Sequence, residues 1–178
     1  PTKAAEVLIT SASGEENGIF FTGTTVSLKG PVRMEKVGFT CVKKQGSGTN
    51  VSYVPVTYTM NIGNFQLTQK DMLSTFCNEE TIPYTVSGSA KGVLKLVSDT
   101  ECSREFAAIK GMNELIVDYT SAQEQGDGYE NFTVDCSGDV NVKNLIVNNS
   151  TVEAKNLTVS AQATLDEASL TAGTAVAN

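Results

Sequence analysis

Apolar and polar residues alternate in short runs along much of the chain, which is the pattern of strands with one buried face. The N-terminal runs that we interpret as strands are Val7–Thr10, 19–21 and the pair Val26 and Leu28. The first of these is aliphatic at three successive positions and is expected to be buried. Further along, the Leu-Ile-Val run at 115–117 predicts another strand.

Two pairs of alternating runs predict β-hairpins. Segment 43–50 is polar and contains two glycines, so we expect it to form an exposed turn. Pro55 cannot donate a ladder hydrogen bond, which places its strand at a sheet edge or a bulge. A second hairpin is predicted for 82–86 and 93–97, joined around 87–89. The alternating residues of the first hairpin are Val37, Phe39 and Cys41 on one strand and Val54, Val56, Tyr58 and Met60 on the other.

Two segments carry the signals of short helices. Thr68 is a candidate N-cap, and Asp71 follows at the position where the helix dipole favours an acid. The apolar face of this helix would be Met72, Leu73, Phe76 and Cys77. The second helix is predicted from residue 99 or 100 to Lys110, with Gly111 as its stop. Its inward residues would be Phe106, Ala107 and Ile109.

Residues 1–133 are therefore expected to form one β-rich globular domain of the α+β class, built from antiparallel strands and two short helices. The chain as a whole is expected to be mainly β. The predicted core residues of this domain are Phe39, Cys41, Val54, Val56, Tyr58, Phe76 and Ile82.

From residue 134 onward, an aliphatic or β-branched residue recurs every six positions. Residues six apart lie on different faces of an α-helix, so this period argues against a helix. It is typical of a β-helix, and 134–178 is predicted to be a hexad-repeat β-helical stalk, with a flat stack of hairpins as the structural alternative. The row is Val134, Val140, Ile146, Val152, Thr158, Thr164, Leu170 and Val176.

Such a stalk is short for a stable stack, about two turns at three faces per turn. A single chain would also leave strand edges open at both ends. We therefore expect either a continuation beyond Asn178 or three copies that share one core. The second possibility predicts a homotrimer held together by 134–178.

The charge balance excludes two classes of partner. Lys and Arg total 13 against 20 Asp and Glu, which gives a net charge of −7, and the basic residues do not cluster beyond Lys43 and Lys44. Binding to nucleic acid or to an anionic membrane requires a basic surface. No run reaches the roughly 18 apolar residues of a membrane span. We expect no nucleic-acid and no membrane partner.

The sequence offers no catalytic, cofactor-binding or metal-binding residue that we would assign. It contains no His, which removes the commonest general base and metal ligand. The acidic pairs 15–16 and 79–80 are interpreted as solvated loop charge. The five tyrosines are interpreted as half-buried strand residues rather than a sugar-stacking surface. They are Tyr53, Tyr58, Tyr84, Tyr119 and Tyr129.

The four cysteines show no close pair of the C-x-x-C kind, so a zinc site is not predicted. Cys41, Cys77, Cys102 and Cys136 are interpreted as small buried hydrophobes with reduced thiols, while two disulfides in one of three pairings remain the alternative. No signal peptide is visible before the first strand, which leads us to expect synthesis in the cytoplasm.

A β-rich head followed by a hexad-repeat stalk resembles bacteriophage virion proteins, in particular head-fibre, decoration and tail-fibre subunits. The resemblance lies in this two-part layout and in 134–178. It implies a structural protein that is not an enzyme: a homotrimer in the virion, with 1–133 docked on a capsid or tail protein and the stalk projecting outward.

Two other classes remain open. A secreted bacterial adhesin or fimbrial subunit at the cell surface would share the Thr- and Asn-rich strands and could hold its cysteines as disulfides. A bactofilin-like polymer would also use short β repeats, but it would normally be repetitive throughout.

Overall fold

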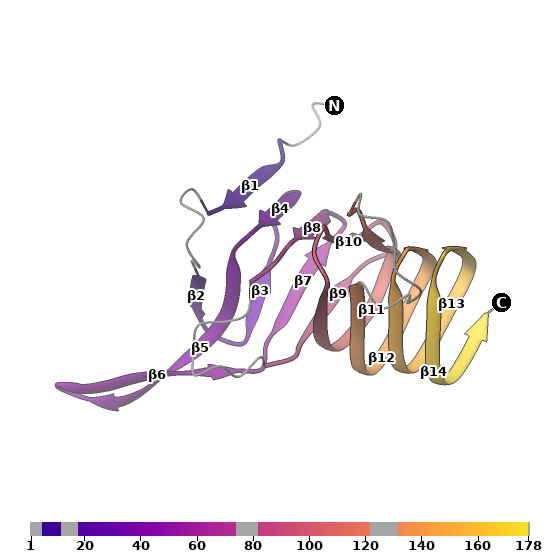
Figure 1. Cartoon of the computed structure of the whole chain (residues 1–178). Coiled ribbons are helices and arrows are strands. Elements are labelled where there is room, and N and C mark those ends of the chain that lie inside the picture. Colours follow the sequence, from indigo (N-terminus) through magenta and orange to yellow (C-terminus); the bar gives the residue numbers. More distant parts are fainter. Residues whose placement is uncertain (1–4, 12–17, 74–81, 122–131, 178) are drawn as a thin grey trace.

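The computed structural model describes residues 5–11, 18–73, 82–121 and 132–177, and every regular element in these segments is a β-strand. Figure 1 shows them as the successive loops of one coil that runs from the N-terminal to the C-terminal end of the chain. The strands are β1 (Val7–Thr10), β2 (Gly18–Thr22), β3 (Thr25–Ser27), β4 (Val32–Glu35), β5 (Gly38–Ser47), β6 (Asn50–Val56), β7 (Thr59–Gly63), β8 (Gln66–Lys70), β9 (Tyr84–Gly88), β10 (Val93–Ser98), β11 (Cys102–Tyr119), β12 (Phe132–Asn148), β13 (Thr151–Asp166) and β14 (Ser169–Ala177).

Almost all strand pairs are parallel. The main path through the sheet is β1-β4-β8-β10-β11-β12-β13-β14, and a second path, β3-β7-β9, joins it at β11. The sheet curves into a half-barrel. Beside it, β2 pairs with β5 in parallel, and β5 pairs with β6 in the one antiparallel pair of the described strands. Neighbouring strands are parallel because, after each turn of the coil, the chain runs in the same direction beside the strand of the preceding turn.

The inward residues form continuous columns, which we define as residues stacked on successive turns, either by pairing in register or by ring contact. Alternate residues of a strand point to the same face, so pairing in register places one buried side chain directly above the next. The first column is Ile9, Met34, Gln69, Leu96, Val117, Val147 and Leu165. The second is Val26, Met60, Val86, Ile109, Val140, Leu157 and Ala175.

A third column is aromatic along most of its length. Ring contacts with centroid separations of 4.5–5.6 Å link Phe21, Phe39, Tyr58, Tyr84 and Phe106 in that order. The register then continues this aromatic column through Cys136 and Ala154 to Ala172. Offset or tilted rings at these distances add to the stabilisation from area burial. The buried hydrophobic members of the three columns belong to one cluster.

The two predicted helices are wrong, since the described residues contain none. Thr68 lies inside β8, which pairs with β4 on one side and β10 on the other. Asp71 ends this strand with a left-handed backbone, φ 46°. Residues 102–110 of the second predicted helix lie in β11, where β9 and β12 flank them. Pairing on both sides overrides the local helix signals. Phe76 and Cys77 lie outside the described residues.

The first predicted hairpin is confirmed only for β5 and β6, since Tyr58 lies beyond β6 and Met60 lies on β7, which pairs in parallel with β3 and β9. Lys43 to Ser47 continue β5 and pair with β6, so the connection narrows to Gly48 and Thr49. Pro55 lies on β6, an edge strand of its three-stranded sheet, as its missing N–H predicts. The second hairpin is wrong: β9 and β10 do not pair with each other, and each pairs in parallel with β11.

The α+β domain with an appended hexad-repeat stalk is also wrong. The C-terminal strands extend the same parallel sheet, and the boundary placed after residue 133 falls inside β12. One coil turn takes 18 residues, as in the register of Val134 with Val152 and of Val152 with Leu170. Bulges shift the register within each turn, so the six-residue row does not stay inward. Val134, Val140 and Val152 are buried, Ile146, Thr158 and Leu170 are half-buried, and Thr164 and Val176 are exposed.

The predicted core is confirmed at three positions. Phe39, Cys41 and Tyr58 are buried. Val54, Val56 and Ile82 are only half-buried, because the first two lie on the edge strand β6 and the third precedes β9. The first strand was expected to be buried, but β1 is largely exposed because it pairs with β4 alone among the described strands.

Candidate functional site

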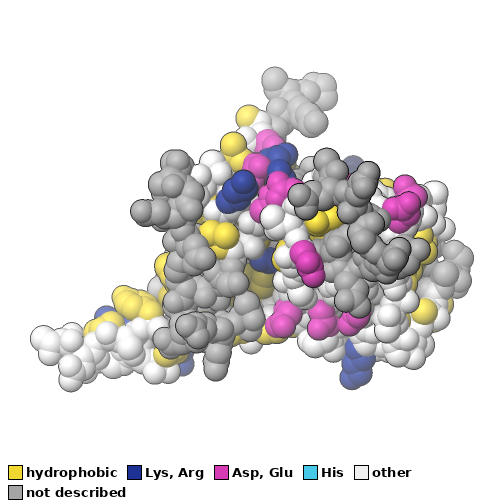
Figure 2. Space-filling model, viewed as in Figure 1, with side chains coloured by type: hydrophobic (Ala, Val, Ile, Leu, Met, Phe, Trp, Pro, Cys, Tyr) yellow, Lys and Arg dark blue, Asp and Glu magenta, His cyan; other side chains and the backbone are white. Residues whose placement is uncertain are grey.

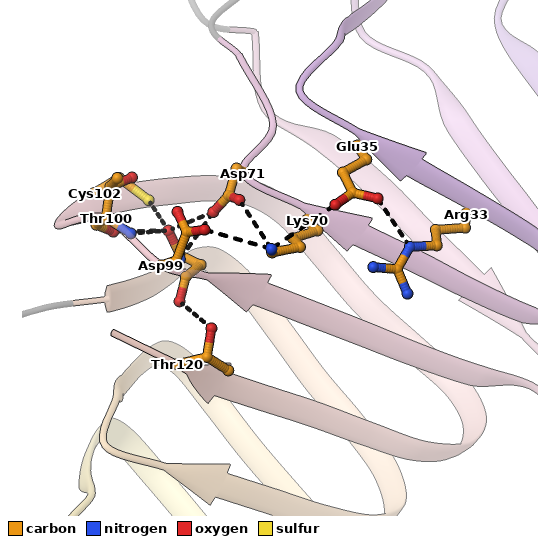
Figure 3. A network of polar contacts seen from close by, with 9 residues as sticks. Arg33, Glu35, Lys70, Asp71, Asp99, Thr100, Cys102 and Thr120 are labelled. Carbon is orange, nitrogen blue, oxygen red and sulfur yellow. Dashed lines mark hydrogen bonds and ion pairs between the residues drawn. The ribbon is translucent and has the colours of Figure 1, made fainter. Parts of the chain in front are cut away.

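Charged side chains gather where β4, β8 and β10 end, because the carboxyl ends of parallel strands meet at one edge of a sheet (Figure 3). Lys70 lies at the centre. Its Nζ is 3.4 Å from an Asp99 oxygen, 3.7 Å from an Asp71 oxygen and 3.8 Å from a Glu35 oxygen. Arg33 extends the network by donating from Nε to Glu35 Oε2 at 3.1 Å. Figure 2 shows these acidic and basic groups side by side at this edge.

Asp71 ties two successive turns of the coil together. Its Oδ1 accepts hydrogen bonds from the Asp99 backbone N–H at 2.8 Å and from Ser98 Oγ at 3.3 Å. Its own N–H donates to the Val97 carbonyl at 3.0 Å. Thr120 N–H in turn donates to the Ser98 carbonyl at 2.8 Å. These bonds satisfy backbone groups that the strand ladder leaves unpaired where the chain turns.

The electrostatics of this edge favour the charged forms of Glu35 and Lys70. The hydrogen bond from Arg33 lowers the pKa of Glu35, although burial acts in the opposite direction. Burial acts to lower the pKa of Lys70, but the hydrogen bond with Asp99 and the charges of Asp71 and Glu35 outweigh it and raise that pKa. Half-exposed ion pairs of this kind typically contribute about 0–1 kcal/mol each. We interpret this network of ion pairs as a connection between the ends of β4, β8 and β10. We call it the clasp, and its members are Arg33, Glu35, Lys70, Asp71 and Asp99.

A small cavity lies beneath the clasp. Its volume is about 10 Å³, and its lining includes Gln69, Asp71, Cys102, Arg104 and Phe132. Gln69 Oε1 accepts a hydrogen bond from Tyr84 Oη at 2.9 Å, while Gln69 Nε2 has no hydrogen-bond partner in the part of the chain that the structure describes. A space of this size is near the lower limit for one water molecule. It is too small for an organic substrate.

Two of the cysteine thiols are held in the core. Cys41 and Cys136 are buried, and this burial raises the pKa of both. Cys102 is half-buried, with its Sγ 3.3 Å from Ser98 Oγ. None of these three is in a disulfide, and Cys77 lies outside the described residues. A raised pKa disfavours the thiolate, so Cys41 and Cys136 have little nucleophilic character at neutral pH.

Among the described residues, the tyrosines and the Lys43–Lys44 pair singled out in the sequence do not form a common site. Tyr58 and Tyr84 are buried and stack at 4.5 Å between ring centroids, whereas Tyr53 is exposed on β6. Burial raises the pKa of Tyr58 above its usual value. Lys43 and Lys44 lie on the exposed part of β5. The acidic pairs 15–16 and 79–80 and Tyr129 lie outside the described residues.

Exposed apolar side chains concentrate at the two ends of the coil. Sequence reasoning missed this because exposure depends on which strand lies beside which. At the N-terminal end, Val7 and Leu8 are each 55% exposed and Phe21 is 39% exposed. At the C-terminal end, Leu165 is 48% and Val176 is 45% exposed. The remaining large exposed hydrophobics of the described chain are Phe20, Val51 and Tyr53.

The comparisons with known proteins give no relative. No protein-family model matches the chain, and neither a curated protein nor a solved structure matches it. Within the described segments, no three Cys, Asp or Glu side chains are placed to hold a metal ion. The described part of the chain likewise includes no helix that could span a membrane.

Proposed function

We propose that this chain is a structural subunit, not an enzyme, and that it assembles into or onto a larger particle. One observation carries the proposal: the described strands form one parallel coil, in which buried columns of side chains run from turn to turn. A coil of this kind offers an extended surface to partners. The β5–β6 hairpin projects from the coil (Figure 1) and exposes Val51 and Tyr53, which favours contact with another protein.

Within this class, we propose the role that the sequence suggests, a virion head-fibre or decoration protein made in the host cytoplasm. The elongated parallel coil in Figure 1 suits a projecting structure, because each added turn extends it without changing its width. In this role, 1–133 would contact a capsid or tail protein. The homotrimer through 134–178 stays a prediction. A core shared by three chains, which motivated this prediction, is not required to bury these residues, since Val134, Val147 and Val152 are already buried within one chain.

The second candidate, a bacterial surface adhesin or fimbrial subunit, also fits an elongated β structure with exposed strand edges. The two candidates differ in location and in cysteine chemistry. An adhesin would lie on the outside of intact cells, and its thiols would have met an oxidising environment.

The test is to fractionate a virus-containing lysate of the producing cells on a density gradient and to detect the chain by mass spectrometry. The expected result is co-migration with intact particles and absence from washed, surface-shaved cells. A cytoplasmic enzyme of the same cells serves as the control for trapped protein. Enrichment in the surface-shaved fraction, with oxidised cysteines, would instead establish the adhesin.

A further inference from the structure

We propose that the projecting part of the β5–β6 hairpin is a docking arm, and that it binds the acidic flank of β11, β12 and β13 in a second copy of this chain. We call residues 43–54 the arm, and we call the exposed Glu105, Asp135 and Glu153 the acidic row. This contact rests on the assembly role proposed above and names the partner. Four features of the molecule support it: the projection of the arm, its two faces, its charge and the charge of the row.

The arm leaves the body of the molecule. β5 pairs with β2 only as far as Val42, and residues 43–47 pair with 50–54 of β6 alone among the described strands. Figure 1 shows this part of the hairpin pointing away from the coil and away from β11, β12 and β13 of its own chain. A two-stranded ribbon in water is at best marginally stable. A partner that covers one of its faces therefore stabilises the arm.

The register gives the arm two different faces. Opposed residues of an antiparallel pair lie on the same face, so Lys44 lies beside Tyr53. Val51 is two positions from Tyr53 and shares this face, on which Val51 is 36% exposed and Tyr53 is 53% exposed. The opposite face is polar apart from one valine, and its members are Lys43, Gln45, Ser47, Asn50, Ser52 and Val54. The face with Tyr53, which combines apolar surface with a lysine, is the one suited to a protein partner.

The charge of the arm is opposite to that of the rest of the chain. The arm holds two of the 13 basic residues and none of the 20 acidic residues. The net charge of the chain is nevertheless −7, so the surface outside the arm is strongly acidic. Complementary potentials attract two protein surfaces and orient them before contact. A second copy of the chain therefore offers the charge that the arm requires.

The acidic row is the part of this surface that suits the arm best. Glu105, Asp135 and Glu153 are paired in register on three successive turns, and no other row of paired residues in the described strands holds three acids. Neighbouring strands lie about 4.8 Å apart, so the three carboxylates repel one another. The exposed Lys155 follows two residues after Glu153, but the ion pairs of the described structure do not include it. A lysine brought by another copy relieves the repulsion within the row.

The test reverses one charge on each side of the contact, in the full chain. Lys44→Glu changes the arm face that carries Tyr53, and Asp135→Lys changes the middle of the acidic row. Lys43→Glu is the matched control, because it makes the same change at the neighbouring position on the opposite face. All three side chains are exposed, so the fold should tolerate the changes. Far-UV circular dichroism melting checks this, and Asp135→Lys should melt no lower than the wild type, because it relieves the repulsion within the row.

Sedimentation velocity then measures self-association. The wild type should associate as its concentration rises, and added salt should weaken this association. Lys44→Glu and Asp135→Lys should each weaken it by about tenfold or more, whereas Lys43→Glu should change it much less. An equimolar mixture of Lys44→Glu and Asp135→Lys should associate again, because it still contains one intact arm and one intact acidic row.

Three results would overturn the inference: a wild type that stays monomeric at tens of micromolar, equal effects of Lys43→Glu and Lys44→Glu, or a mixture that stays dissociated. A monomeric wild type that Lys44→Glu releases from virus particles would also overturn it, because the arm would then bind an acidic surface of the particle. A wild-type monomer that co-migrates with the particles would leave the proposed function standing.

Discussion

Gln69 places an amide in a column whose other members are aliphatic or Met. It is 2% exposed, and its one protein partner in the described structure is the Tyr84 hydroxyl. Gln69 lines the small cavity, and its amide nitrogen has no hydrogen-bond partner among the described residues. A buried polar group without a partner costs about 1–3 kcal/mol, so Gln69 depends on Tyr84 more than a surface glutamine would.

This dependence can be measured with a double-mutant cycle. Tyr84→Phe keeps the ring stack with Tyr58 but leaves both ends of the Gln69 amide unpaired. We expect it to lower the free energy of unfolding by about 1–3 kcal/mol. Gln69→Leu combined with Tyr84→Phe should recover most of that loss, because neither unpaired group remains. Urea unfolding of Tyr84→Phe, of Gln69→Leu and of the double variant provides the values, and strictly additive effects would show that the pair is not coupled.

At the scale of elements, the strands end in a recurring corner. Lys36, Asp71, Asn149 and Glu167 directly follow β4, β8, β12 and β13, and each has φ between 46° and 53°. The register places Lys36 beside Asp71 and Asn149 beside Glu167, and the turns in which β10 and β11 end lie between these two pairs. Left-handed backbone costs non-glycine residues about 1–2 kcal/mol, least for Asn and Asp. The coil therefore bends at the same place in each of these turns whatever side chain is present.

Lys36 is the best corner to test, because it is exposed and its side chain has no ion pair in the described structure. Lys36→Gly should leave stability unchanged or raise it by up to about 1 kcal/mol, since relief of strain offsets the added freedom of the unfolded chain. Lys36→Val should cost about 1–2 kcal/mol, because a β-branched side chain fits this conformation worst. Thermal melting compares the two, and equal melting temperatures would contradict the corner interpretation.

At the scale of the whole molecule, the three columns run from the first turn to the last without a break. Val152 on β13 belongs to the same hydrophobic cluster as Phe39 and Tyr58 near the other end. In such a stack, each turn is stabilised by its contacts with the neighbouring turns. A separate stalk would instead unfold without affecting the N-terminal turns.

The two possibilities differ in the response to Val152→Asp. A carboxylate at this buried position has no partner, so we expect a loss of several kcal/mol, whereas the exposed Lys155→Asp should be nearly neutral. All five tyrosines lie before residue 134 and report only on the N-terminal turns. Tyrosine fluorescence and far-UV circular dichroism should therefore shift together in denaturant. A tyrosine transition that stays at its wild-type midpoint would indicate an independent C-terminal unit.

The sequence by itself determined that strands predominate and which residues alternate within them. It also identified the β5–β6 hairpin, the edge position of Pro55 and the buried Phe39, Cys41 and Tyr58. These features follow from side-chain periodicity and from the missing N–H of proline, which act within a few residues. The change of pattern at Val134 reflected a real repeat, but its structural unit is the 18-residue turn.

Only the tertiary structure decided that the strands pair in parallel, because parallel partners are separated by a whole turn and share no local turn signal. The helix signals at Thr68 and near residue 100 failed for the same reason: each segment gains hydrogen bonds on both sides from distant strands. The clasp around Lys70 and the exposure of Val7 and Leu165 likewise depend on which strands lie side by side. A short apolar run has the same local pattern at an edge as in the interior, and its neighbours alone determine which it is.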